Sequence, residues 1–376
     1  MAEVLGPQNL LNLALPTGWD ATKITQWAMR DGVTYGELAN MVALALGDFN
    51  EEMTINWGWC FGLTEELAME YPNGGSVTAM TELTDTDKPE PLHGTTIGHM
   101  IDLRAYGEGI GGSWRYFRDA RSPQITAAIR NIVLRARWRF EQKLLDRWFT
   151  NTENSLGSSG YDVPFVRGTG GNVDFAPPAF DGESFTTSHD HYIGVDSDSK
   201  GYDDVLNELA EHLAEHGHMS PYTALVAKAD VESYRTLTNW VEIVEQVAGG
   251  VSVDQGGLTS TNRFFVASER PFGLLGHYNS AHGLITVRYS NRVPTGYAGM
   301  TKSYGQLDAR NGLAVRVHPD VGFGAYIRPE TLPDDDFPIK QLDCLFEFGV
   351  SVGTDRTNGA ATYLDSSGSW SNPSIS

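Results

Sequence analysis

The fold is decided by residues 122–149, which read SPQITAAIRNIVLRARWRFEQKLLDRWF. Ser122 is a good N-cap, and Pro123 stands in the first turn, where the N–H that proline lacks would be unpaired anyway. Apolar residues then recur at steps of three and four, the spacing of one buried helical face: Ile125, Ile129, Ile132, Val133, Ala136, Phe140 and Leu144. The pattern predicts a helix over Pro123–Phe149, about 40 Å long.

The other face of this predicted helix is basic, although the chain is acidic. Its formal net charge is −21, with 27 lysines and arginines against 48 aspartates and glutamates. Such a balance argues against general affinity for nucleic acid, which needs phosphate neutralisation, and the helix has no recognition module. We therefore expect salt bridges to acidic loops of neighbouring copies of the chain, with weak contact to DNA as the lesser alternative. The basic residues are Arg130, Arg135, Arg137, Arg139, Lys143 and Arg147.

Composition sets broad limits on the class of protein. The 376 residues are enough for two or three compact units, and 40% hydrophobic residues are enough for a core. No apolar run reaches the length of a membrane span, and residues 1–5 do not resemble a secretory signal. Two cysteines, Cys60 and Cys344, indicate a reducing compartment. Arginine greatly outnumbers lysine, which fits a halophilic host or a skewed genome composition equally well.

The first third of the chain predicts segments that are too small to form a hydrophobic core of their own and must pack against other parts of the protein or other copies. Residues 1–73 predict an extended arm with short helices, the best of them over Tyr35–Asp48. A long β-ribbon follows, with an outgoing strand over Ser76–Leu83 and a return over Thr95–Ala105. A two-stranded ribbon is marginally stable alone, so we expect arm and ribbon to pack against other copies. The polar ribbon tip offers charged contacts through Asp85, Asp87, Lys88 and Glu90.

The glycines that follow the ribbon have two interpretations. Gly107-Glu-Gly109-Ile-Gly-Gly112 formally matches the dinucleotide fingerprint, but no helix opens at these glycines, as that motif requires. The predicted helix starts about ten residues later. We therefore expect a flexible hinge between ribbon and helix.

The rest of the chain predicts an α/β region followed by strands. A helix is expected over Tyr202–His216, with Gly217 as its stop. A buried strand is expected at Pro221–Ala227, and another helix at Ala229–Thr238. The serine-rich tail, Ser366–Ser376, would normally fray, so we expect neighbouring copies to hold it. Further strands are predicted at His191–Val195, Phe264–Ala267, Gly283–Tyr289, Leu313–His318, Gly322–Ile327 and Leu345–Val352.

Histidines give the only notable metal-like pattern. His212 and His216 stand one helical turn apart, His218 follows, and His189-Asp-His191 would add ligands. The metalloprotease motif needs a glutamate directly after the first histidine, and Leu213 is there instead. Surface histidines at a helix end are the commoner case, because the helix dipole favours cations there. A metal-dependent hydrolase that uses these histidines is kept as the alternative of a different class.

No convincing active site emerges from the other motifs. Residues 196–201 begin like a calcium loop, but Lys200 stands at a ligand position and Asn207 where a bidentate glutamate belongs. No phosphate-binding lysine loop is present, and Asp334–Asp336 reads as a solvated loop. We expect no enzymatic activity and no cofactor.

Taken in order, these segments resemble the major capsid proteins of tailed double-stranded DNA viruses, whose Hong Kong 97-type fold is shared with encapsulins. The resemblance is one of architecture over nearly the whole chain. It matches Ser122–Asn151 to the spine helix of the peripheral (P) domain and Ser76–Ala105 to the extended (E) loop. Tyr202–Leu237 is similar to the opening of the axial (A) domain, and Leu345–Leu364, after an Ile339-Lys-Gln linker, to the closing strands.

The resemblance implies an α+β fold and a domain order. Residues 1–73 would form the N-terminal arm and the start of the P domain, and residues 74–118 the E-loop ribbon and hinge. Residues 119–200 would form the P domain with its spine helix at 123–149, and residues 201–338 the A domain. Residues 339–376 would return to the P domain and end in the tail. A covalent crosslink, known in one branch of the family, would need a ribbon lysine and a partner asparagine, and Lys88 and Asn358 could take these roles.

The implied function is self-assembly into hexamers and pentamers of an icosahedral shell around a double-stranded DNA genome, in a tailed phage or an archaeal tailed virus. Scaffolding, portal or decoration proteins and the packaged DNA would be partners, and no membrane is involved. The protein would reside in the virion, and in the host cytoplasm during assembly. An encapsulin-like shell around a cargo enzyme and a β-rich receptor-binding or tail protein remain as alternatives.

Overall fold

A computed structural model of the chain describes residues 30–33, 35–73, 95–113, 119–155, 161–167, 180, 185, 189–242, 273–327 and 339–375. The chain divides into two compact units, each assembled from segments that are distant in sequence. The first contains residues 1–54, 103–141 and 316–349, and the second contains the remainder. Among the helices that the structure describes, none combines the length and hydrophobicity needed to cross a membrane.

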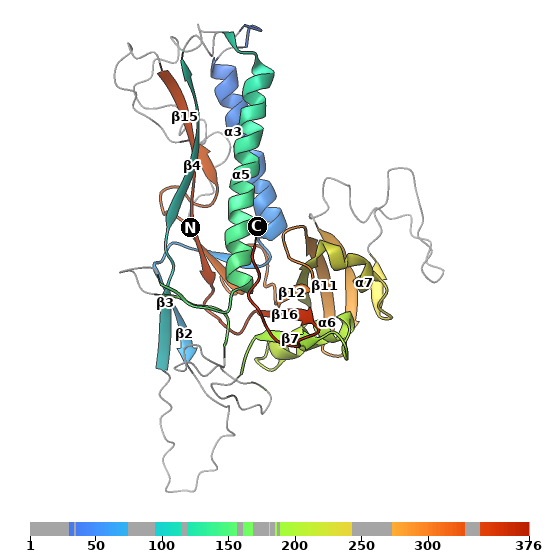
Figure 1. Ribbon diagram of the computed structural model, residues 1–376. Helices are drawn as coiled ribbons and strands as arrows, with labels where there is room; N and C mark the ends of the chain where they lie inside the picture. The colour runs from blue at the N-terminus through green and yellow to red at the C-terminus, as the bar shows by residue number, and fades with distance from the viewer. Residues whose placement is uncertain are drawn as a thin grey trace. The chain divides into compact units, whose positions relative to one another are not determined.

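The long basic helix predicted from periodicity is confirmed as α5 (Ser122–Phe149). Its buried residues include Ile125, Ile129, Ile132, Phe140 and Leu144, all members of the predicted stripe. The other two members, Val133 and Ala136, are half-buried. A second long helix, α3 (Tyr35–Trp57), runs beside α5 in the first unit (Figure 1).

Helix α3 continues well past the predicted end at Asp48 because its apolar spacing continues. Val42, Leu46, Phe49, Met53 and Trp57 are all buried, at steps of three and four. The stripe therefore reaches the end of the helix, whereas the sequence-based prediction stopped at the first polar residues.

The N-terminus of α5 is capped by a residue from elsewhere in the chain. The Asp31 carboxylate accepts hydrogen bonds from the backbone N–H of Ser122 at 2.8 Å and from its hydroxyl at 2.6 Å. These bonds hold the pKa of Asp31 below its usual value. Ser122 is therefore the first helical residue and not the predicted N-cap. The Gln124 side chain accepts from the Arg121 backbone N–H at 3.0 Å, one half of a capping box.

Strand β15 (Ile339–Val352) supplies the aromatic centre of the first unit. Phe346 and Phe348 stand two residues apart, on one face of the strand, and both rings pack on Phe140 of α5. Their centroids lie 5.8 and 5.3 Å from that of Phe140. Phe49 of α3 meets Phe346 edge-on at 5.9 Å. The aromatic side chains of this strand thus pack against both long helices.

The predicted glycine hinge is wrong, because those residues form part of a strand. β4 (Arg104–Ser113) pairs antiparallel with β15 from Ile339 opposite Ser113 to Phe348 opposite Arg104. A Cβ added at Gly107 would collide with the Leu345 side chain. The glycine therefore lets the Leu345 side chain of β15 lie close to the backbone of β4. The predicted Ile339-Lys-Gln linker is likewise the start of β15. On its other side β15 pairs with β14 (Ala325–Ile327).

The second unit contains a seven-stranded mixed sheet. Only two neighbouring pairs are parallel, β8 with β11 and β7 with β16. The predicted A-domain range, 201–338, omits β7 and β16, although both belong to this sheet. In spatial order the strands are β7 (Tyr192–Asp196), β16 (Ala360–Asp365), β12 (Tyr297–Thr301), β8 (Tyr222–Ala227), β11 (Gly283–Ser290), β10 (Leu274–Ser280) and β9 (Trp240–Glu242).

Helix α6 (Tyr202–Ala214) packs on this sheet as its sequence predicts. Val205, Leu206, Leu209 and Leu213 are buried against it. Gly217 has φ +84°, the left-handed conformation expected of a helix stop. The helix predicted at 229–238 appears as a short turn, η2 (Lys228–Asp230), followed by α7 (Val231–Arg235).

The β-ribbon is confirmed near its base but begins earlier than predicted. β2 (Ala68–Asn73) pairs antiparallel with β3 (Thr95–Met100). The predicted outgoing strand, Ser76–Leu83, lies outside the described residues, as do Phe264–Ala267, Asp334–Asp336 and most of the arm. The chain also contains β1 (Phe61–Thr64), β5 (Asn154–Ser155), β6 (Tyr161–Asp162) and β13 (Leu313–Arg316).

The C-terminal tail is held by contacts with its own chain, and the expected contacts with neighbouring copies stay a prediction. The Tyr297 hydroxyl donates to the Ser371 carbonyl at 2.8 Å, and the Gln142 amide donates to the Ile375 carbonyl at 3.2 Å. The Trp370 ring packs edge-on against Tyr192, with centroids 5.1 Å apart. These aromatic and backbone contacts within the second unit hold the tail in place, although its serine-rich sequence alone would favour fraying.

Candidate functional site

The arginines of α5 largely meet partners within their own unit. Arg135 forms an ion pair with Glu108 of β4 at 2.6 Å, and Arg137 pairs with Glu52 of α3. The Arg139 guanidinium lies 5.5 Å from the ring centre of Tyr106, a cation–π distance. Arg130 is exposed. Because the Arg135 side chain remains 67% exposed, it also stays accessible to a neighbouring molecule.

Arg147, predicted from the same pattern, occupies a different environment. Its side chain is 2% exposed and forms an ion pair with Asp162 at 2.8 Å. The guanidinium also donates to the carbonyls of Thr150 and Thr152. Burial would lower the pKa of Arg147, but the Asp162 carboxylate keeps it above the usual value. Since its own chain surrounds it, we leave Arg147 out of any interface between copies.

The sequence analysis missed exposed apolar side chains on the long helices, two of which are the most exposed. Leu44 of α3 is 63% exposed, and Leu134 of α5 is 46% exposed. Leu134 directly precedes Arg135, so an apolar contact point adjoins the accessible arginine. The signal was available in the sequence, because Leu134 falls outside the predicted apolar stripe.

Three histidine side chains converge at a single point in the second unit. The Nε2 atom of His191 lies 2.9 Å from that of His216 and 3.1 Å from that of His189. The Nε2 atoms of His216 and His189 are also 3.1 Å apart. His189 and His191 lie in the segment that enters β7, and His216 follows the end of α6. The structure thus brings the predicted His189-Asp-His191 pair to the predicted His216.

The protein fixes the chemical state of these rings. His191 is fully buried, and its Nδ1 lies 2.7 Å from the Gly359 carbonyl oxygen. Burial, reinforced by the neighbouring histidines, lowers the pKa of His191 well below its usual value and that of His189 to about 3. Both imidazoles are therefore neutral near pH 7, the state in which histidine binds metals.

Two further potential ligands border the cluster. His212, Glu215 and His189 form a second group whose ligand atoms all lie within 4.8 Å of one another. His212 Nδ1 lies 2.8 Å from the Glu208 carbonyl oxygen. The Phe185 ring packs over His189 and His216, with centroid distances of 4.2 and 4.5 Å.

His218, the third histidine predicted as a weak metal candidate, is not part of this cluster. Its Nδ1 lies 3.1 Å from the Tyr304 hydroxyl, and its Nε2 lies 2.9 Å from the Thr357 hydroxyl. The left-handed turn at Gly217 sends His218 away from His216, since the helix has ended. Both ring nitrogens of His218 therefore have structural partners.

Two other sequence candidates are occupied by local hydrogen bonds. The Asn358 side chain is fully buried and donates to the carbonyls of Lys302 and Arg310 at 3.0 and 2.8 Å. This environment does not suit the predicted crosslink, whose other member, Lys88, lies outside the described residues. In the loop at residues 196–201, which only begins like a calcium loop, Asp196 accepts from the Asp198 backbone N–H at 3.0 Å, and Lys200 pairs with Glu208.

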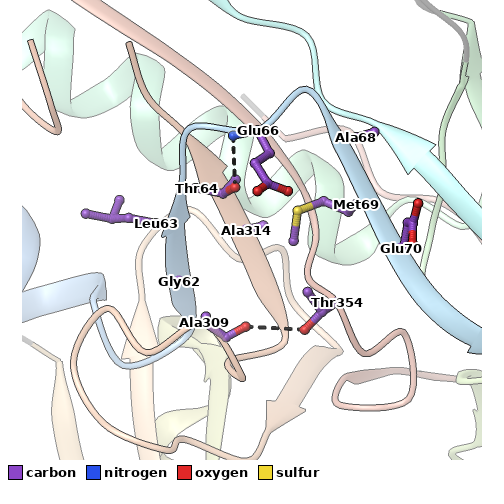
Figure 2. A pocket seen from close by; sticks show the side chains of 10 residues that line it. All are labelled: Gly62, Leu63, Thr64, Glu66, Ala68, Met69, Glu70, Ala309, Ala314 and Thr354. Atoms are coloured by element: carbon purple, nitrogen blue, oxygen red, sulfur yellow. Dashed lines mark hydrogen bonds between the residues drawn. The ribbon is translucent and has the colours of Figure 1, made fainter. Parts of the chain in front are cut away.

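A cavity of about 420 Å³ lies at the base of the β-ribbon (Figure 2). Figure 2 shows the Glu66 backbone N–H hydrogen-bonded to the Thr64 hydroxyl, and Thr354 bonded to the Ala309 carbonyl across it. Among the described residues that line it there are two carboxylates but no histidine, cysteine, lysine or arginine. We therefore assign it no chemistry. Its lining residues are Gly62, Leu63, Thr64, Glu66, Ala68, Met69, Glu70, Ala309, Ala314 and Thr354.

Comparison with known proteins identifies the fold. No family model matches the chain, and no curated protein matches it. A solved structure from Mycobacterium phage Patience matches with a TM-score of 0.61 and 21% identity, covering 92% of each chain. This match confirms the α+β fold of the Hong Kong 97 type that the sequence predicted.

Weaker matches come from the mature capsid of bacteriophage PhiM1 and the capsid of an empty GTA particle. The first has a TM-score of 0.46 and 11% identity, covering 81% of this chain and 86% of the other. The second has a TM-score of 0.43 and 13% identity, covering 83% and 90%. Because both TM-scores lie below 0.5, we base no inference on them.

Proposed function

We propose that this chain is the major capsid protein of a tailed double-stranded DNA virus, and that copies of it assemble into the hexamers and pentamers of an icosahedral shell. The observation that carries this proposal is the fold, shared over 92% of both chains with a phage protein.

The surface of the first unit supports association between copies. Leu44 and Leu134 expose apolar side chains on the two long helices, where burial against a neighbour would be favourable. Arg130 and Arg135 add accessible positive charge to a chain whose net charge is −21, so the acidic surface of a second copy is an attractive partner. Contacts of this head-to-tail kind close into rings when the rotation between copies is suitable.

The domain roles follow from the same proposal. Helix α5 is the spine of the P domain, and β2 with β3 forms the base of the E-loop. The seven-stranded sheet with α6 is the core of the A domain. Scaffolding, portal or decoration proteins bind the assembled shell, DNA contacts are non-specific, and the chain resides in the host cytoplasm before it enters the virion.

We favour a genome-enclosing shell over an encapsulin-like compartment, because the structure with the matching fold comes from a phage. The role is structural and not catalytic: the histidine cluster is covered by Phe185 and includes a fully buried ring, unlike the open position that a catalytic metal needs. Nucleic acid inside purified particles supports this choice, and a co-purifying cargo enzyme with no nucleic acid contradicts it.

The proposal is tested by assembly of the purified chain and two matched variants. We expect closed shells in negative-stain micrographs of the wild type. Leu134→Glu places a charge on the proposed contact surface and should abolish the shells. Met219→Glu makes a comparable change at a 65% exposed apolar side chain of the second unit, outside that surface, and should leave the shells intact. Equal assembly of both variants contradicts the proposed contact. A wild-type chain that stays monomeric contradicts the function.

A further inference from the structure

The histidine cluster of the second unit has the geometry of a metal site. Imidazole nitrogens bind zinc at about 2.0–2.1 Å, and in a tetrahedral site they lie about 3.3 Å apart. The three Nε2 atoms of His189, His191 and His216 are 2.9–3.1 Å apart, within a few tenths of that separation. An ion at bonding distance from all three would lie about 1 Å from their plane.

Hydrogen bonding alone does not account for this triangle. Each Nε2 atom carries either a hydrogen or a lone pair, so among three atoms at least two are alike. Because all three atoms contact one another, at least one contact must then bring two hydrogens or two lone pairs together. His191 holds a lone pair at Nε2, since its Nδ1 donates to the Gly359 carbonyl at 2.7 Å. A cation that accepts all three lone pairs removes the conflict.

The surroundings provide a fourth ligand from α6. His212 donates from Nδ1 to the Glu208 carbonyl at 2.8 Å, which leaves its Nε2 lone pair available. His212 and Glu215 both approach His189, with all three ligand atoms within 4.8 Å of one another. The hydrogen bonds at His191 and His212 are of the kind that orient metal-ligating imidazoles.

We propose that His189, His191 and His216 bind one divalent transition-metal ion of the zinc type, with His212 or Glu215 as the fourth ligand. The set is rich in nitrogen, which suits zinc and disfavours magnesium and calcium. The Phe185 ring covers His189 and His216, and His191 is fully buried, so the ion is structural.

The ion would join three parts of the second unit. His189 and His191 belong to the segment that enters β7, His216 follows α6, and the Gly359 carbonyl precedes β16. Because such a site does not exist in the unfolded chain, binding stabilises the folded state. The inference does not depend on shell formation, since the metal is measured per chain in any assembly state.

The test uses the full-length chain, stripped with EDTA and dialysed, then titrated with zinc. We expect one zinc per chain by elemental analysis, and a melting temperature at least about 3 °C higher with zinc in large excess over its dissociation constant. Magnesium should not have this effect. Cobalt(II) should give the visible absorption spectrum of tetrahedral nitrogen ligation, which a non-specific surface ion does not give.

Two matched variants locate the ion. His189→Gln replaces one proposed ligand by an amide of similar size and should weaken zinc binding about 100-fold or more. His282→Gln changes a histidine in the turn between β10 and β11 and should bind zinc as the wild type does. The proposal is overturned if the wild type takes up no stoichiometric zinc at micromolar free metal. It is equally overturned if His189→Gln and His282→Gln bind zinc alike.

Discussion

Two ion pairs on the same helix differ in nearly every physical respect. Arg135 and Glu108 stand with side chains 67% and 42% exposed, whereas Arg147 and Asp162 are 2% and 11% exposed. The pairs have similar lengths, 2.6 and 2.8 Å. The exposed pair is screened by water and salt, so its net contribution is small. The buried pair has lost its hydration, so each member depends on the other.

The difference separates structural from intermolecular roles along α5. The sequence prediction put both arginines on one basic face. At 3.6 residues per turn, however, Arg147 stands about 120° from Arg135 around the axis, in line with the apolar residues Phe140 and Leu144. The structure assigns Arg147 to the interior of its own chain, together with the carbonyls of Thr150 and Thr152. Charge on the first part of α5 is available for contacts between copies, and charge at its end is not.

The largest expected effect comes from breaking the buried pair. Arg147→Met leaves Asp162 as an unpaired buried charge and should lower the free energy of unfolding by about 3–5 kcal/mol. Urea unfolding followed by circular dichroism measures the change. The double variant Arg147→Met with Asp162→Leu should be less destabilised than the single one. A single variant within about 1 kcal/mol of wild type would show that the pair is not buried.

A buried base near this pair should make stability depend on pH. Burial lowers the pKa of His99 to about 4. The Asp162 carboxylate opposes this with a smaller effect, and the Arg356 charge lowers the pKa further. The unfolded chain has an ordinary histidine pKa near 6.5, so below that pH it binds a proton that the folded chain refuses. Stability is therefore full above pH 6.5 and falls towards pH 4, by up to about 3 kcal/mol from this residue.

The contribution of His99 is isolated by a variant. His99→Gln should flatten the pH dependence of the unfolding free energy between pH 6.5 and 4, while other buried histidines retain theirs. Parallel curves for the variant and the wild type would contradict the assigned environment of His99.

The exposed pair should matter little to the single chain. Arg135→Ala should change the free energy of unfolding by less than about 1 kcal/mol, and added salt should make the difference smaller still. The same variant should reduce the yield of assembled particles, because it removes accessible charge from the proposed contact surface. A loss of stability as large as that of Arg147→Met would erase the distinction between the two pairs.

The smallest effect is expected at the start of α5. Asp31→Asn removes the charge that accepts from the Ser122 backbone and hydroxyl but keeps an acceptor oxygen. We expect a small decrease in melting temperature and faster amide exchange in the first turn of α5 alone. Faster exchange throughout the helix would show that the cap does more than fix its end.

Local patterns predicted the helices well. The stripes of α5 and α6 have the spacing of a buried helical face, and burial follows it from Ile125 to Leu144 and from Val205 to Leu213. Partners distant in sequence were not predictable. The glycines of β4 appeared to be a hinge because their partner strand, β15, begins more than two hundred residues later, and the cap of α5 lies at Asp31.

The histidine cluster was predicted in part. Helical spacing grouped His212 with His216, and the pair His189 and His191 was recognised as a source of added ligands. The sequence did not show which of these histidines lie close together. Pairing with β16, far along the chain, places β7 in the sheet, and α6 packs against that sheet. His218 was included for its proximity in sequence, and one left-handed glycine, Gly217, separates it from the cluster.

The central claim is that this chain forms a shell of many copies. Sedimentation velocity of the purified full-length chain at rising concentration tests it most directly. We predict a discrete, fast-sedimenting species of megadalton mass that Leu134→Glu abolishes and Met219→Glu preserves. A single slow species with the mass of one folded chain, unchanged at the highest concentration, would contradict the account.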